Sequence, residues 1–229
     1  MSTKKNLDKD YNKDGYVIVH CYSRKEYLKI KNFIYEKIYK ILKIKKDLKT
    51  YHLWVEKIQI KHDINFQGKN RFFNVPKELK KIILNKNVEY VIKSLIGKNE
   101  IWRDKRGLFS FRIIRPGLND GYPYSRKEWG PAKNVLSMWV PILGNTKNET
   151  LKLLPKSHKK NFKKYLPKKS KFQKEEFRLL DKVNESNFKR FDIDYGKVLF
   201  YHPKLIHSEN VEKSKVTRIN LEFRANPKI

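Results

Sequence analysis

Cysteine is almost absent from this sequence, which contains a single one, Cys21, among 229 residues. One thiol excludes an intramolecular disulfide and is typical of a reducing compartment. Long apolar runs are missing too, because no stretch approaches the roughly 18 consecutive apolar residues of a membrane-spanning helix. The first residues also lack the apolar core of a secretory signal peptide. These absences favour a cytoplasmic protein without a membrane span.

Acidic side chains are scarce as well. There are 24 Asp and Glu residues against 54 Lys and Arg, which gives a formal net charge of +30. Such an excess attracts nucleic acid, acidic surfaces and phosphorylated metabolites. However, most of the cations are lysine, and the accompanying abundance of Asn, Ile, Tyr and Phe is typical of AT-rich coding sequence. No helix-turn-helix, zinc-finger or RNA-binding signature occurs. Compositional drift and an anionic partner both stay open, with nucleic acid the less favoured partner.

Apolar periodicity divides the chain into a helical first part and a strand-rich second part. Residues 15–20 read as a short strand, and residues 23 to about 46 as a helix that Ser23 and Glu26 cap. Pro76 begins a second helix, which runs to about residue 96. Short β-branched and aromatic segments then predict the strands of a sandwich or barrel, at residues 108–117, 134–144, 150–158, 191–203 and 216–224.

A lysine-rich stretch at residues 159–189 interrupts these strands, and we expect it to be a loop with a helical piece around residues 174–183. The whole pattern predicts one α+β domain over residues 1–229. Residues 1–97 would form mainly helical support packed on the outside of one sheet. Residues 98–229 would form a β-barrel that carries the insertion.

The most informative residues lie between positions 196 and 224. A strand ends near His202, a turn carries His207, and a β-branched strand returns with Thr217 and Arg218, the latter eleven residues after His207. A guanidinium pairs with a carboxylate through two parallel hydrogen bonds, which lysine imitates poorly. An imidazole at a strand end can direct a nitrogen at a metal. This arrangement resembles the C-terminal half of the phytanoyl-CoA dioxygenase family, which belongs to the iron- and 2-oxoglutarate-dependent oxygenases.

Segments upstream resemble the same family. They are the leading DGYVIV at 14–19, RIIRPG at 112–117, the loop NDGYPYSRKEW at 119–129 and PKSH at 155–158. The resemblance implies a double-stranded β-helix of the jelly-roll or cupin type. It also implies that His207 occupies the distal iron-ligand position and that Arg218, with Thr217, binds the distal carboxylate of 2-oxoglutarate.

Two of the three iron-ligand positions are replaced. Where the family has His-x-Asp, this chain has Ser125 and Lys127. Iron(II) in such a site takes two imidazoles and one carboxylate. A hydroxyl is a poor ligand and an ammonium repels the metal, so we expect no iron at the usual triad. A rebuilt site would need Glu128 and an imidazole from His158 or His202.

A site of this kind has two other uses. Alternate residues of a strand share a face, so we expect Ser125 and Lys127 to point towards His207. With an anion held by Arg218, Lys127 or His207 could carry a proton in metal-free acid/base chemistry. The site could equally bind the anion as a pseudoenzyme.

The ligand itself is only broadly defined. Tyr124 and Trp129 lie in the loop at the mouth of the predicted barrel, where aromatic rings can stack on a sugar or base. We expect a small anionic metabolite that is 2-oxoglutarate-like, phosphorylated, or linked to a sugar or nucleotide. Four functions therefore stay open: a metal-free enzyme, a binding pseudoenzyme, an active iron/2-oxoglutarate hydroxylase with unusual ligands and, less favoured, a basic nucleic-acid-binding protein.

Overall fold

The computed structural model describes residues 6–58, 72–97, 99–101, 108–117, 124–125, 135–162, 164–165, 177–179, 183–208 and 214–227. Its α-helices are α1 Leu7–Asp14, α2 Arg24–Leu42, α3 Tyr51–Trp54, α5 Lys77–Ile83 and α6 Lys86–Ile96, and its short 3-10 helices are η2 Leu48–Thr50, η3 Glu56–Ile58, η4 Ser157–Lys159 and η5 Glu185–Asn187. Its strands are β1 Tyr16–His20, β2 Phe72–Phe73, β3 Asn99–Ile101, β4 Phe109–Ile114, β5 Tyr124–Ser125, β6 Leu136–Leu143, β7 Lys152–Leu153, β8 Lys164–Tyr165, β9 Phe177–Leu179, β10 Lys197–Tyr201, β11 His207–Ser208 and β12 Arg218–Pro227.

The strands form two antiparallel sheets. The larger runs in the order β1-β10-β6-β12-β4-β2, with β3 also paired to β12, and the smaller runs β7-β11-β5-β9-β8. Buried apolar side chains join the sheets, because Trp139 and Leu199 of the larger sheet share one cluster with Leu153 of the smaller. The sheets therefore enclose an interior between them.

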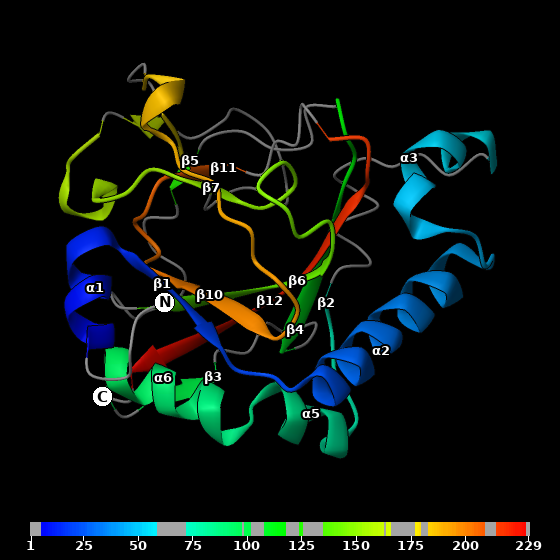
Figure 1. The fold of residues 1–229 in the computed structure, drawn as a ribbon, viewed down its shortest axis with the longest axis horizontal. Coiled ribbons are helices and arrows are strands. Elements are labelled where there is room, and N and C mark those ends of the chain that lie inside the picture. The colour runs from blue at the N-terminus through cyan, green and yellow to red at the C-terminus, as the bar shows by residue number, and fades with distance from the viewer. Residues whose placement is uncertain are drawn as a thin grey trace.

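The helices cover the other face of the larger sheet, as Figure 1 shows for α2, α5 and α6. The main core lies here, where the helices and the sheet contribute fully buried side chains such as Ile30, Ile34 and Val88 on one side and Ile219 and Leu221 on the other. Each such side chain contributes about 1.5–3 kcal/mol by leaving water. The predicted α+β plan, with helices packed on one sheet, is confirmed.

Helix α2 begins as predicted. Ser23 and Glu26 form a capping box, in which the Ser23 hydroxyl accepts from the Glu26 N–H and the Glu26 carboxylate accepts from the Ser23 N–H. The helix ends at Leu42, earlier than expected, because Lys43 adopts a left-handed conformation with φ of 56°.

One continuous helix was predicted from Pro76 to about residue 96, and this prediction was wrong. The helix is divided into α5 and α6 at Leu84 and Asn85. The Asn85 side chain accepts from the N–H groups of Asn87 and Val88 and donates to the Cys21 carbonyl. Asn85 thus caps α6 and binds the segment that leads into α2. In a continuous helix Asn85 could not be the N-cap of α6.

The expected helical piece around residues 174–183 was also wrong where the structure describes it. Residues 177–179 form strand β9, which pairs with β5 and β8. Most of that expected piece lies outside the described residues. The sequence prediction also missed α1 and the short helices between residues 48 and 58. Among the helices that the structure describes, none has the length and apolar character needed to span a membrane.

Candidate functional site

Strand β12 carries polar residues at every second position. Ile219 and Leu221 face the helix-covered core, whereas Arg218, Asn220 and Glu222 alternate with them and are buried on the opposite face. Arg224 continues the same alternation and is also buried. The face of β12 that looks into the enclosed interior is therefore polar and charged.

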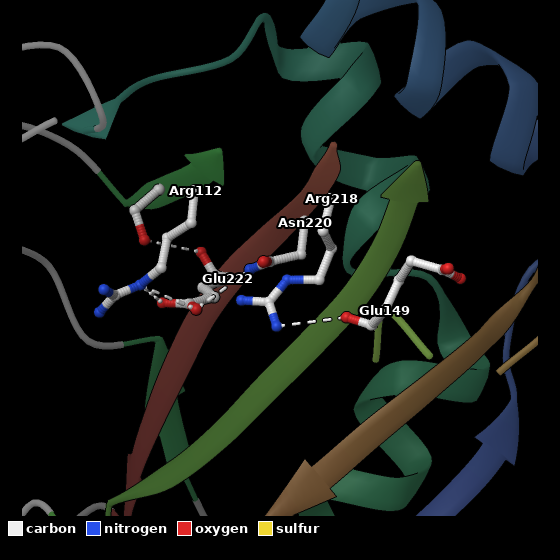
Figure 2. Close-up of polar contacts among 6 residues, drawn as sticks. Arg112, Glu149, Arg218, Asn220 and Glu222 are labelled. Carbon is white, nitrogen blue, oxygen red and sulfur yellow. Dashed lines mark hydrogen bonds and ion pairs between the residues drawn. The ribbon is translucent and has the colours of Figure 1, made fainter. Parts of the chain in front are cut away.

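Arg218 is fully buried, with 0% of its surface exposed. Its NH1 group donates to the Glu149 carbonyl oxygen at 3.4 Å, and its guanidinium carbon lies 5.8 Å from the centre of the Trp139 ring. Figure 2 shows the carboxylate of Glu149 turned away from Arg218, where it accepts from the hydroxyls of Thr146 and Ser214. The nearby carbonyl and ring face thus stabilise the cation and fix its position.

A second buried arginine lies on the neighbouring strand (Figure 2). Arg112 Nε lies 3.1 Å from Glu222 Oε1 and 3.2 Å from Glu222 Oε2, and Asn220 donates to Glu222 Oε1 at 3.1 Å. On the inward faces of β4 and β12, Arg112, Arg218 and Arg224 thus accompany one acid, Glu222.

His207 reaches the interior from the smaller sheet. It pairs with Leu153 of β7 and with Tyr124 of β5, and 2% of its surface is exposed. Its Nδ1 lies 2.7 Å from the Leu205 carbonyl oxygen. A carbonyl can only accept, so Nδ1 carries a proton in this contact. The ring also packs edge-on against Tyr201, at 5.1 Å between centres.

Strand β5 carries Ser125, the first of the two positions that we expect to replace iron ligands. Its pairing with β11 places Tyr124 directly opposite His207. Lys127, Trp129 and the side chains of Tyr124 and Ser125 lie outside the described residues, so their proposed roles stay predictions.

Thr217 precedes Arg218 but has different contacts. Its hydroxyl lies 2.9 Å from His52 Nδ1, and its N–H donates to the Lys49 carbonyl. These bonds attach the start of β12 to the short helices before residue 58. The role of Thr217 beside a carboxylate therefore stays a prediction.

The two histidines considered for a rebuilt metal site lie together near α1. The His158 and His202 rings are 5.2 Å apart, and His158 Nε2 contacts the Asn12 carbonyl at 3.2 Å. Burial, with smaller contributions from His158 and Lys204, lowers the pKa of His202 to about 4. Both imidazoles thus belong to a contact between α1 and the chain around residues 158 and 202.

The described residues supply no complete set of iron ligands. Within the described ranges, no three His, Cys, Asp or Glu side chains are grouped so that they could hold a metal ion. The loop at 119–129 contains Asp120 and Glu128 but no histidine. A carboxylate, in contrast, fits the buried guanidinium of Arg218.

Sequence reasoning identified Arg218 and His207 but missed Asn220, Glu222 and Glu149. The first two carried a signal, because residues 218–224 alternate polar and apolar side chains in a strand that was expected to line a barrel. Glu149 lies between strands, and its backbone carbonyl accepts the hydrogen bond from Arg218. Since any residue type can supply a carbonyl, its contact with Arg218 left no signal in the sequence.

No protein-family profile matches the sequence, and no curated protein matches it. Solved structures do resemble the chain over nearly its whole length. The non-heme monooxygenase ThoJ in its apo form gives a TM-score of 0.60 at 14% identity, covering 96% of this chain and 77% of that one. The epimerase SnoN in complex with Fe3+, alpha ketoglutarate and nogalamycin RO gives 0.58 at 11%, covering 98% and 83%.

A third structure is EctD from S. alaskensis with 2-oxoglutarate and 5-hydroxyectoine. It gives a TM-score of 0.59 at 14% identity and covers 99% of this chain and 76% of that one. Identities this low establish the fold alone. The chain thus has the fold of the non-heme iron, 2-oxoglutarate-dependent oxygenases.

Proposed function

We propose that this chain is a phytanoyl-CoA dioxygenase-like protein whose double-stranded β-helix binds a small carboxylate through Arg218, without iron at the usual triad. The fully buried guanidinium of Arg218, at the start of β12 and against the face of Trp139, is the observation that carries the proposal. The ligand class is a 2-oxoglutarate-like acid, and phosphorylated, sugar-linked or nucleotide-linked acids belong to the same class of anion.

The order of the strands supports a double-stranded β-helix. From β4 to β7 the chain passes alternately to the larger and the smaller sheet, and it does so again from β10 to β12. Such alternation is the winding of a jelly roll. In this arrangement the first and last strands of the winding, β4 and β12, lie side by side, which is the pairing of Arg218 with Ile114.

The charge at Arg218 supports an anionic ligand. Arg218 is fully buried and donates to the Glu149 carbonyl oxygen at 3.4 Å, and its guanidinium lies against the Trp139 ring. A buried arginine held in this way is the group that binds a carboxylate with two parallel hydrogen bonds. A ligand carboxylate at Arg218 could take up that bidentate geometry.

The replacements at Ser125 and Lys127 support binding without iron. In the family that this sequence resembles, those positions supply an imidazole and a carboxylate to the metal. Here they supply a hydroxyl and an ammonium. A 2-oxoglutarate-like acid would therefore depend on Arg218 for its main polar contact.

Metal-free acid/base catalysis is the second candidate function, and the geometry of His207 favours it. The bond from Nδ1 to the Leu205 carbonyl sets the tautomer, so in a neutral ring Nε2 would be the basic nitrogen. A base of fixed tautomer beside a bound acid can remove a proton from a neighbouring carbon or hydroxyl. His207→Gln tests this role, since the variant should still bind the acid but lose any proton exchange at its carbon, measured by NMR in deuterium oxide.

Calorimetric titration with succinate, glutarate and 2-oxoglutarate in excess EDTA tests the main proposal. The wild type should bind at least one of these acids, and Arg218→Ala should weaken that binding about 100-fold, as expected for the loss of about 3 kcal/mol of charged hydrogen bonding. Arg218→Lys should bind the acid with intermediate affinity, because lysine keeps the positive charge but cannot form the two parallel hydrogen bonds of a guanidinium. Arg115→Lys is the matched control, since Arg115 pairs with Glu56 elsewhere. Equal binding by the wild type and Arg218→Ala would overturn the proposal.

A further inference from the structure

Three buried uncharged polar atoms on the inward face of the larger sheet have no hydrogen-bond partner within the described part of the chain. They are Nε1 of Trp139, on β6, and Oδ1 of Asn220 and of Asn226, on β12. Asn226 lies six positions further along β12 than Asn220, whereas Trp139 and Asn220 lie near Arg218. Both residues have 0% of their surface exposed. A buried polar atom left without a partner costs about 1–3 kcal/mol, so native proteins usually satisfy each one with protein, water or a ligand.

Both atoms lie close to Arg218. The guanidinium of Arg218 is 5.8 Å from the centre of the Trp139 ring. Asn220 is two positions along β12 from Arg218, which places it on the same face about 6.6 Å away. Across the strands Trp139 is paired with Glu222, so Asn220 is its diagonal neighbour, at about 7–8 Å between backbones. A molecule of four to six heavy atoms in length spans such distances.

The hydrogen-bonding character of both atoms is fixed. The indole Nε1 can only donate. Asn220 Nδ2 lies 3.1 Å from Glu222 Oε1, and a carboxylate paired with Arg112 is an acceptor, so the amide nitrogen must face it. Asn220 Oδ1 is therefore the free atom of the amide, and it can only accept. One donor and one acceptor thus lie beside the cation.

We propose that the acid held by Arg218 also carries a hydroxyl group, so that the ligand of this site is a hydroxycarboxylic acid. The inference rests on the proposed function of Arg218. The hydroxyl oxygen would accept from Trp139 Nε1, and its proton would be donated to Asn220 Oδ1. A ketone can only accept and an ammonium can only donate, so each leaves one of the two atoms unsatisfied.

Titration of matched acids against the wild-type protein in excess EDTA tests this inference without any variant. The pairs are malate with succinate and 2-hydroxyglutarate with glutarate, each hydroxy acid as separate enantiomers, with 2-oxoglutarate as the keto acid. One enantiomer of a hydroxy acid should bind at least about tenfold more tightly than its deoxy partner, and more tightly than the keto acid. Equal affinity within both pairs would show that water fills the position, and would overturn the inference.

Trp139→Phe tests whether Trp139 Nε1 donates a hydrogen bond to the ligand hydroxyl. This change removes the N–H but keeps a ring beneath Arg218, so the ratio of the hydroxy-acid affinity to the deoxy-acid affinity should fall towards one, whatever happens to both affinities together. Trp54→Phe is the matched control, because Trp54 Nε1 donates to the Asp47 carbonyl in another part of the fold. An unchanged preference in Trp139→Phe would contradict the assignment.

Failure of the inference differs from failure of the proposed function. If the acids bind through Arg218 but the hydroxyl makes no difference, only the hydroxyl inference falls. If no acid depends on Arg218, the proposed function falls as well. Should Trp139→Phe fold poorly, which its thermal melting would reveal, the ratio of affinities in the wild type still decides the inference.

Discussion

The histidine pair beside α1 should make the protein less stable in mild acid. His202 packs 6.1 Å from Tyr11 and 5.2 Å from His158, and its Nδ1 accepts from the Lys204 N–H at 3.0 Å. Its pKa is lowered from 6.5 to about 4, first by burial and then by His158 and Lys204. The folded protein therefore holds this ring neutral across a range in which the unfolded chain protonates it.

The sign and size of the effect follow from that difference. Between about pH 6.5 and pH 4 the unfolded chain binds more protons at this position, so stability is fully present above pH 6.5 and declines as the pH falls to 4. The two pKa values correspond to about 3 kcal/mol at 1.36 kcal/mol for each pH unit. Because the ring is only partly enclosed, solvent screening reduces the expected loss to about 2 kcal/mol.

Urea denaturation at several values between pH 7 and pH 4 measures this loss. His202→Asn keeps an acceptor for the Lys204 N–H but removes the titrating ring, so its free energy of unfolding should fall by about 2 kcal/mol less than that of the wild type over this range. His20→Asn, at an exposed histidine, is the matched control and should follow the wild type. Parallel curves for wild type and His202→Asn would refute the reasoning.

Two further predictions concern stability. Glu222→Ala leaves Arg112 buried without its carboxylate and should lower the free energy of unfolding by about 3–5 kcal/mol in urea denaturation, whereas Arg112→Met combined with Glu222→Leu should lie closer to the wild type. Gly15→Ala should lower the free energy of unfolding by more than the about 1–2 kcal/mol that left-handed strain costs an alanine. The additional loss is expected because the new Cβ would lie 2.5 Å from His158 Nδ1. In a His158→Ala background the contact with His158 is absent and the left-handed strain remains, so a loss on Gly15→Ala that is the same in both backgrounds would contradict a clash with His158.

Much of the fold could be predicted because local signals agreed with tertiary packing. Ser23 and Glu26 stand at the spacing of a capping box, and α2 begins there. The break between α5 and α6 escaped prediction because apolar residues continue through it at helical spacing. Asn85 decides the break by capping α6 and binding the Cys21 carbonyl, a contact over 64 residues that no local pattern reveals.

The candidate site was predictable where side-chain type carries the chemistry. Arg218 and His207 were proposed from a resemblance to a known family, and both are buried in the structure, while their roles stay predictions. The fully buried Trp139 ring lies beneath Arg218. That contact depends on the pairing of β6 with β12, which joins residues about eighty positions apart in the chain. Such a register arises from the whole sheet, so local sequence did not reveal it.

The most direct test of the account compares the binding of a dicarboxylic acid with and without iron. The dissociation constant of the tightest-binding acid would be measured by anaerobic calorimetry, once in excess EDTA and once with excess iron(II). The proposed function has Arg218 as the main polar contact and no iron at the usual triad, so it predicts that the two constants agree within about twofold. Binding that appears only with iron(II) would contradict the central claim and favour an active oxygenase with unusual ligands.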